Sequence, residues 1–268
     1  MTTTTVPKTA KGTAKKSGKA TWLGILAMAI VIIVWVVATD LTQFANPLKL
    51  PYPSNVARTA GNLGFDIFGH IWATSVRLYL GLVVGAVLGV ACGLAMAANR
   101  YIEGLLDPFI ELFRPVPALA FIPFFILWMG IGDPPKVLLV AMGCFLTMVV
   151  TTLEAARNQP KDYVRAARTL GAKEHHIYRT VVLPGIFPGL FAGIRLSSAL
   201  AFTLVVAAEF MGAQQGIGYM ILVAQRTLDT SAMLYGIVLI AAMSYLTDLV
   251  IRRWGAHAMK WTDRTAAA

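Results

Sequence analysis

The sequence predicts an all-α integral membrane protein with six transmembrane helices. Only 13% of its 268 residues are charged and 57% are hydrophobic, whereas soluble domains contain about 25% charged residues. A helix needs about 20 apolar residues to cross the hydrocarbon core of a bilayer. Six stretches are candidates for such helices: residues 21–40, 71–97, 109–130, 136–156, 189–211 and 233–252.

The distribution of basic residues predicts the orientation of these spans. Residues 1–20 are rich in Lys, Thr and Ala and nearly free of large apolar residues, so we expect a disordered cytoplasmic tail. Six spans bring the chain back to the side on which it began, and most of the 23 Lys and Arg residues fall on that side. Because cytoplasmic loops are rich in Lys and Arg, both termini are expected in the cytoplasm, including a C-terminal tail over 256–268. The net charge of +10 then reflects topology and requires no nucleic-acid partner.

The second predicted span carries a glycine at every fourth position. Residues four apart share one face of a helix, and glycine on that face lets another backbone approach closely. The neighbour can be another span of the same subunit, which we favour, or a second subunit. The glycines are Gly81, Gly85, Gly89 and Gly93.

The third predicted span is interrupted by prolines. Pro115 and Pro117 lie near its start and Pro123 lies further in. Proline removes a backbone hydrogen bond and clashes with the preceding turn. We therefore expect the helix over 109–130 to be kinked or broken near the cytoplasmic face.

Four charged residues within the spans are candidates for ion pairs. Arg77 and Glu209 lie at matching depths near the outer ends of their spans, and Arg195 and Asp248 match near the inner face. Ionisable groups at such depths mark a functional or structural role. Two structural ion pairs are expected, with attraction of an anionic substrate as the alternative role of Arg77.

The basic loop between the fourth and fifth spans, residues 157–188, contains a short predicted helix over 163–171. It is expected to begin at Tyr163, because Pro160 breaks the preceding helix and Asp162 can cap the new one. Tyr163, Ala167 and Leu170 share one face of this helix, because they follow the spacing i, i+4, i+7. Gly171 is expected to end it, since glycine adopts the left-handed geometry of a helix end without steric cost. Small side chains next to such a face allow the helix to sit deeply in a groove of a partner.

The same loop carries a sparse sequence pattern over residues 165–184. Two adjacent alanines are followed by a glycine four positions after the second, and later by Leu-Pro. This spacing resembles the cytoplasmic EAA loop of bacterial ABC-importer permeases, the part that contacts the ATPase, although Arg165 stands where the family has Glu. The residues that the resemblance assigns to ATPase coupling are Tyr163, Arg165, Ala166, Ala167, Leu170, Gly171, Leu183 and Pro184.

Further stretches extend the resemblance over about residues 51–255. Residues 107–117 and 122–132, the pair Ala208-Glu209 and the turn 216–218 resemble the taurine/nitrate/sulfonate/bicarbonate class of permeases, and 107–117 is most similar to the taurine subgroup. The resemblance implies a type I ABC-importer permease domain over 21–255 in the bacterial inner membrane. It also implies a homodimer, two ATPase subunits that bind ATP and Mg, and an external substrate-binding protein. This chain would then be non-catalytic, with no cofactor or metal of its own, and would carry taurine, another alkyl sulfonate or, alternatively, nitrate, bicarbonate or another small organic anion.

An ion-coupled secondary transporter is the alternative from another class. Such a protein is expected to place carboxylates or histidines near the midplane of its spans. Here the carboxylates of Asp40, Glu154, Glu209 and Asp248 lie toward the ends of the predicted spans. The sequence therefore favours the ATP-driven importer over this alternative, and a membrane-embedded enzyme is a more distant one.

Overall fold

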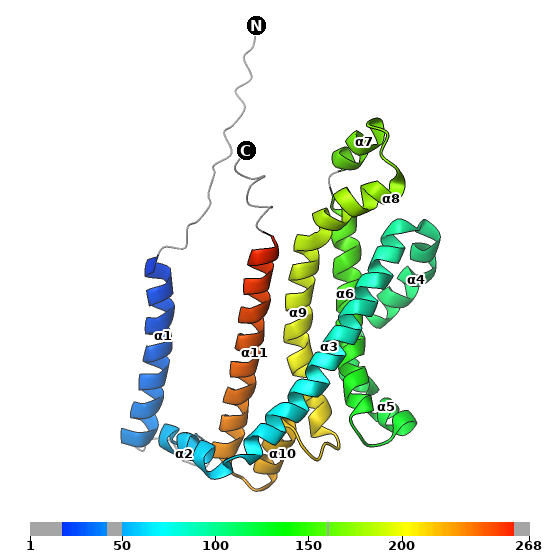
Figure 1. Ribbon diagram of the computed structural model, residues 1–268. Helices are drawn as coiled ribbons and strands as arrows, with labels where there is room; N and C mark the ends of the chain where they lie inside the picture. Colours follow the sequence, from blue (N-terminus) through cyan, green and yellow to red (C-terminus); the bar gives the residue numbers. More distant parts are fainter. Residues whose placement is uncertain (1–17, 42–49, 160, 260–268) are drawn as a thin grey trace.

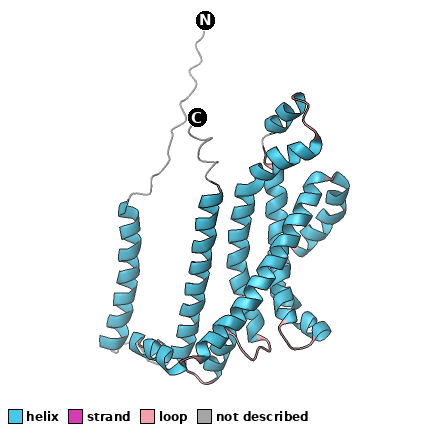
Figure 2. Ribbon diagram, in the orientation of Figure 1, coloured by secondary structure: helices cyan, strands magenta, loops and turns pink. Residues whose placement is uncertain are grey.

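The computed structural model describes residues 18–41, 50–159 and 161–259, and this part of the chain consists of helices joined by short turns (Figures 1 and 2). Most of the predicted tails, 1–20 and 256–268, lie outside these residues. Helix α1 nevertheless begins at Gly18 and α11 continues to Ala258, so both helices extend into the predicted tails. In chain order, with η for π- or 3₁₀-helical segments, the elements are α1 (Gly18–Val36), η1 (Val37–Leu41), α2 (Pro53–Leu63), α3 (Asp66–Ala98), α4 (Arg100–Phe113), η2 (Ala118–Phe121), α5 (Ile122–Met129), α6 (Pro134–Arg157), α7 (Lys161–Thr169), α8 (Glu174–Ile177), η3 (Tyr178–Val182), α9 (Leu183–Phe210), α10 (Ile217–Arg226) and α11 (Thr230–Ala258).

Four helices in the described part are long and apolar enough to cross a bilayer. They are α3, α6, α11 and a continuous helix, His175–Phe210, that contains most of α8 together with η3 and α9. A fifth candidate is the bent pair formed by α4 and Ala118–Met129. The first predicted span corresponds to α1 and η1, whose apolar stretch Leu26–Asp40 is shorter than a full span. The predicted long spans lie within the observed helices or match them closely, except at the start of the fifth, but α3 begins at Asp66 and α11 continues to Ala258, beyond the predicted limits.

The third predicted span, 109–130, is not one continuous helix. Helix α4 ends at Phe113, and the chain bends by 90° before Ala118. Pro115 and Pro117 lie inside the break, where the missing N–H groups and the clash with the preceding turn prevent helix continuation. The predicted break in this segment is confirmed.

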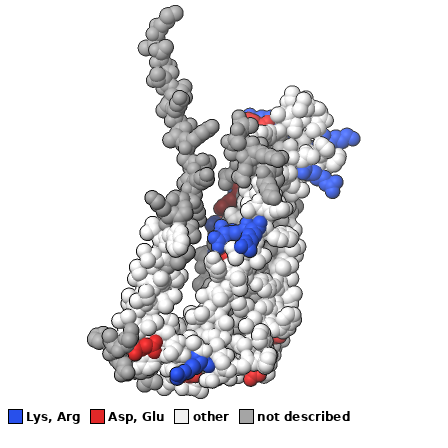
Figure 3. All heavy atoms as spheres, turned by 60° about the vertical axis from the view of Figure 1, so that its left-hand side comes forward, with Lys and Arg blue, Asp and Glu red and all other residues white. Residues whose placement is uncertain are grey.

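The two ends of the bundle carry different short helices. Helices α7 and α8 project from one end, together with the start of α1 and the end of α11, whereas α2, α5 and α10 lie at the other end (Figure 1). We call these the α7 end and the α10 end. On the flank seen in Figure 3, charged side chains are sparse and lie mainly near the two ends and in one basic cluster between them. An uncharged surface of this kind suits contact with lipid chains.

The centre of the bundle is formed by α3, α6 and α9. Leu78, Val140 and Val205, one from each helix, are fully buried. Helix α1 contributes little to this core, because Trp22 and Ile33 on it are more than half exposed. A hydrogen bond of 3.2 Å from the Trp35 indole Nε1 to the Pro51 carbonyl ties α1 to the segment before α2.

The four glycines of α3 face α6 in a constant register. A Cβ atom built on Gly81 would lie 2.6 Å from the Val140 Cβ, and one on Gly93 would lie 2.7 Å from the Thr152 Cβ. On both helices the contacting residues recur at every fourth position. This spacing is typical of helix pairs that cross closely with a right-handed angle in membranes. The neighbour of the glycine stripe is therefore α6 of the same subunit. The two central glycines, Gly85 and Gly89, face Cys144 and Met148.

This contact predicts opposite effects for one substitution at two glycines. Alanine at Gly89 places a Cβ 2.6 Å from the Met148 Cβ, so the helices must separate, and overpacking typically costs about 1–3 kcal/mol. Alanine at Gly104 in α4 meets no atom within 4 Å and is expected to stabilise its helix slightly. Thermal unfolding in detergent, monitored by size-exclusion chromatography of heated samples, should show a lower midpoint temperature for Gly89→Ala only. Equal midpoints for both variants would contradict the packing described above.

Candidate functional site

Helix α7 forms a short arm outside the bundle at the α7 end (Figure 1). It spans Lys161–Thr169 and therefore begins two residues before the predicted start at Tyr163. Gly171 has a φ of +77°, and its N–H donates to the Arg168 carbonyl at 2.9 Å. The N–H of Ala172 donates to the Ala167 carbonyl at 3.1 Å. These two bonds form a Schellman motif, and the predicted role of Gly171 in ending the helix is confirmed.

One side of the arm presents apolar side chains to solvent. Leu170 is 87% exposed and Tyr163 is 67% exposed. Ala166 is also exposed, and Ala167 is half-buried. Two large apolar residues with small residues between them form a surface that a folded partner can cover.

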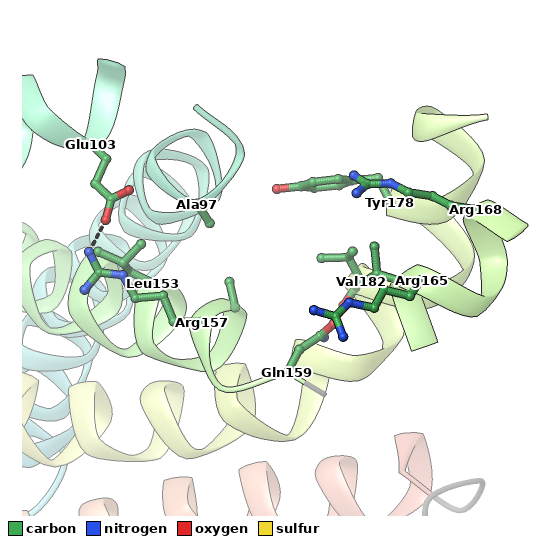
Figure 4. A pocket seen from close by; sticks show the side chains of 11 residues that line it. Ala97, Glu103, Leu153, Arg157, Gln159, Arg165, Arg168, Tyr178 and Val182 are labelled. Carbon is green, nitrogen blue, oxygen red and sulfur yellow. Dashed lines mark hydrogen bonds and ion pairs between the residues drawn. The ribbon is translucent and has the colours of Figure 1, made fainter. Parts of the chain in front are cut away.

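The other side of the arm faces a pocket of about 610 Å³. Val164, Arg165 and Arg168 of α7 line it, together with Tyr178 (Figure 4). Arg157 lies across the pocket, where it pairs with Glu103 of α4. The arm therefore presents Arg165 and Arg168 to the pocket, and Tyr163 and Leu170 to the outside.

The arm is connected directly to a membrane-crossing helix. The Gln159 side-chain Nε2 donates to the Val182 carbonyl at 2.7 Å, which joins the end of α6 to η3. The predicted pattern residues Leu183 and Pro184 form the first turn of α9. Residues 170–173 join α7 to α8, so the arm leads directly into the continuous helix His175–Phe210.

At the α10 end, the second predicted group of residues forms a buried ionic cluster. Glu209 is completely buried and Arg77 is 5% exposed. The Arg77 Nη1 lies 2.6 Å from the Glu209 Oε1, so this predicted ion pair is present. The Arg77 Nε also lies 2.7 Å from Asp133 Oδ1, and Nη1 donates to the Gln215 carbonyl at 2.6 Å.

Glu209 also fixes the start of α10. Its Oε2 accepts a hydrogen bond of 2.8 Å from the Gly218 N–H, and a carboxylate at a helix N-terminus is favoured by the helix dipole. The Thr74 hydroxyl donates to Glu209 and accepts from the Ile217 N–H at 2.8 Å. A Cβ on Gly218 would lie 2.8 Å from the Glu209 Cβ, so this contact requires glycine.

The other predicted pair is more exposed. The Arg195 Nε lies 2.8 Å from the Asp248 Oδ1, with side chains that are 48% and 34% exposed. Asp248 also pairs with Arg252, four residues further along α11, at 3.0 Å. This pair joins α9 to α11 at the surface of the bundle, whereas the Arg77–Glu209 pair is buried.

Sequence reasoning missed three residues around the Arg77–Glu209 pair. Thr74 lies one turn before Arg77 on the same helix face, so spacing could have indicated it. Asp133 stands directly before the prolines that begin α6, a position typical of a helix start. Lys136, which stands at the start of the fourth predicted span, is buried in the first turn of α6.

Comparison with known proteins gives consistent results. Residues 81–257 match the family described as "Binding-protein-dependent transport system inner membrane component". The chain is 33% identical over 246 residues to the taurine transport system permease protein TauC of Escherichia coli (strain K12), covering 89% of each chain. It is 34% identical over 264 residues to a protein of Bacillus subtilis (strain 168) that carries the name aliphatic sulfonates transport permease protein SsuC, covering 96% of this chain and 95% of that one.

A solved structure shares the fold. A chain of the MetNI methionine ABC transporter in an inward-facing conformation superposes with a TM-score of 0.63 at 20% identity, covering 74% of this chain and 98% of that chain. The all-α fold is therefore that of an ABC-importer permease. On these matches, the chain belongs to the family of binding-protein-dependent transport system inner membrane components.

Proposed function

We propose that this chain is the membrane-spanning subunit of an ATP-driven importer that moves taurine or another alkyl sulfonate into the cytoplasm. The similarity to TauC and SsuC over about nine-tenths of each chain supports this substrate class. The observation that carries the transport role is the α7 arm, because its Leu170 and Tyr163 are exposed apolar residues outside the bundle. In this proposal, they dock into an ATPase subunit.

The proposed assembly contains two copies of this chain, two cytoplasmic ATPase subunits that bind ATP and Mg, and an external substrate-binding protein. The α7 end faces the cytoplasm, and both termini lie on that side. The basic residues of the sequence support this orientation, since they are concentrated in the segments at the α7 end. Hydrolysis takes place on the ATPase subunits, and this chain contributes the pathway and the coupling surface.

The continuous helix His175–Phe210 is the proposed route of coupling. Its 36 residues extend over about 54 Å. The α7 arm joins one end of this helix, and Glu209 is the penultimate residue at its other end. Movement of the arm by the ATPase subunits would therefore shift the loop that Glu209 holds in place. Such coupling is a shift of population between two states of the bundle.

Nitrate is the second candidate substrate. The nitrate import permease protein NrtB of Synechocystis sp. (strain ATCC 27184 / PCC 6803 / Kazusa) is 24% identical over 233 residues, covering 84% of this chain. The lower identity favours a sulfonate, and a transport assay separates the two anions directly.

Uptake into proteoliposomes that contain this chain and its ATPase subunits tests the proposal. With the binding protein outside and ATP inside, we expect saturable uptake of labelled taurine that unlabelled ethanesulfonate suppresses and nitrate does not. A non-hydrolysable ATP analogue is the control and should abolish uptake. Nitrate uptake without taurine uptake would overturn the substrate. Uptake driven by an ion gradient without ATP would overturn the importer class.

A further inference from the structure

A second pocket lies at the α10 end, between the turn that precedes α6 and the loop that precedes α10. Its volume is about 540 Å³. Arg77 and Lys136 line it, together with Asp133 and the loop residues Gly212 and Gln215. The pocket is therefore bordered by side chains of the ionic cluster and by backbone of the loop that Glu209 holds.

Lys136 is a buried cation at the N-terminus of a helix, where positive charge is unfavourable. Its side chain is 5% exposed and lies in the first turn of α6, where the helix dipole disfavours positive charge. The ammonium donates to the Gly132 carbonyl and, at 3.4 Å, to the Gly212 carbonyl. Among the residues that the structure describes, no carboxylate forms an ion pair with it. The carboxylates of Asp133 and Glu209 attract this ammonium through space but do not hydrogen-bond to it, so it can still donate to an anion that enters the pocket.

Arg77, which lines the same pocket, has an unused hydrogen-bond donor at Nη2. Its Nε and Nη1 are used by Asp133, Glu209 and the Gln215 carbonyl. Its Nη2 has no acceptor within the described parts of the chain. A guanidinium carries five N–H donors, so this edge is available to an anion in the pocket.

The buried part of the ionic cluster contains two cations and one carboxylate, whereas the second carboxylate is exposed. The charged side chains classed as buried in the described ranges are Arg77, Lys136 and Glu209, so the buried charge is positive. The balancing carboxylate, Asp133, has a side chain that is 65% exposed and contacts Arg77 Nε. Asp133 therefore occupies the position of a replaceable anion at the rim of the pocket.

We propose that this pocket is a binding subsite for the sulfonate group of the solute, in which Lys136 and Arg77 Nη2 donate to its oxygens. The identity of the anion rests on the function proposed above, whereas the presence of an anion site rests on the buried cations. A sulfonate is a monoanion whose three oxygens each accept hydrogen bonds, which suits an ammonium beside a guanidinium edge. Because the Gly212 carbonyl also accepts from Lys136, a bound sulfonate competes with the loop that precedes α10.

The test is ¹⁹F NMR of trifluoromethanesulfonate with the permease–ATPase complex in maltoside detergent, without ATP or binding protein. Binding should broaden the ¹⁹F resonance, and taurine should reverse the broadening. Lys136→Met should weaken binding at least about tenfold, since a charge-assisted hydrogen bond is lost. Lys136→Arg should retain it. Arg226→Met, which removes an exposed cation at the same end, is the matched control and should leave binding unchanged.

A second variant covers the case in which Lys136→Met does not fold. Asp133→Asn removes the competing carboxylate at an exposed position, and it is expected to tighten binding several-fold. Equal broadening in wild type, Lys136→Met and Asp133→Asn would overturn the subsite. Displacement of the probe by phosphatidylglycerol in nanodiscs, with the same dependence on Lys136, would assign the pocket to a lipid headgroup and overturn the solute assignment.

The subsite and the proposed function fail in different ways. Taurine uptake with no Lys136-dependent probe binding would retain the transport function and reject the subsite. Lys136-dependent probe binding without taurine uptake would retain the anion site and reject the substrate.

Discussion

Replacing Leu170 with aspartate is expected to abolish stable association of this chain with its ATPase subunits, and with it ATP-driven transport. Leu170 is 87% exposed, so the substitution removes little from the folded bundle itself. At an interface, burial of a leucine contributes about 1.5–3 kcal/mol, which corresponds to a tenfold or larger change in affinity. Aspartate adds the cost of desolvating a charge. Co-purification of the ATPase with tagged permease measures the effect.

The matched control is Leu228→Asp at the α10 end. Leu228 is 73% exposed, and its φ of 57° is one that aspartate tolerates. This variant should co-purify with the ATPase like the wild type. Tryptophan at the exposed Ala166 should reduce association through bulk. If Leu170→Asp retained full association and ATP-driven uptake, the α7 arm would not be the coupling surface.

Replacing Glu209 with glutamine is expected to produce the largest loss of stability in the bundle. The substitution leaves Arg77 buried with only Asp133 as an anionic partner, and breaking a buried ion pair costs about 3–5 kcal/mol. It also weakens the acceptor for the Gly218 N–H at the start of α10. The thermal midpoint in detergent should fall by on the order of 10 °C. Asp248→Asn, in the exposed pair with Arg195, is the control and should have a much smaller effect.

Exchanging charges gives a second measurement on the same two pairs. Arg77→Glu with Glu209→Arg is not expected to restore stability, because an arginine at 209 would place donors against the Gly218 N–H, which needs an acceptor. Arg195→Asp with Asp248→Arg should recover part of the loss caused by either single reversal, since the hydrogen bonds of this pair run between side chains. Recovery is incomplete because an arginine at position 248 would face Arg252. Full rescue of the buried pair would contradict the network around Glu209.

Features of the fold that depend on local sequence were predictable. The long spans follow from uninterrupted apolar residues, and the end of α7 follows from Gly171. Matching depth was enough to pair Arg77 with Glu209, because two buried charges on adjacent spans stabilise each other. The glycine stripe indicated close packing, but its partner helix could be assigned only from the structure.

Features that depend on contacts between distant elements were not predictable. Asp133 reaches Arg77 across 56 residues of sequence, and nothing local to either residue indicates the contact. The burial of Lys136 depends on the carbonyl of Gly212, 76 residues away. The bend between α4 and α5 was anticipated from proline, but its 90° angle depends on how the flanking helices pack.

The position of Arg77 has a consequence for the order in which the protein is made. Ribosomes synthesise α3 early, and the Glu209 partner of Arg77 follows 132 residues later. Until then, the 33 residues of α3 must keep the guanidinium in the membrane through their own apolar side chains, against an insertion cost of up to about 3 kcal/mol. The charge of Arg77 is paired with Glu209 only after α9 has inserted beside α3. The ion pair with Glu209 therefore forms only in a chain whose synthesis has passed α9.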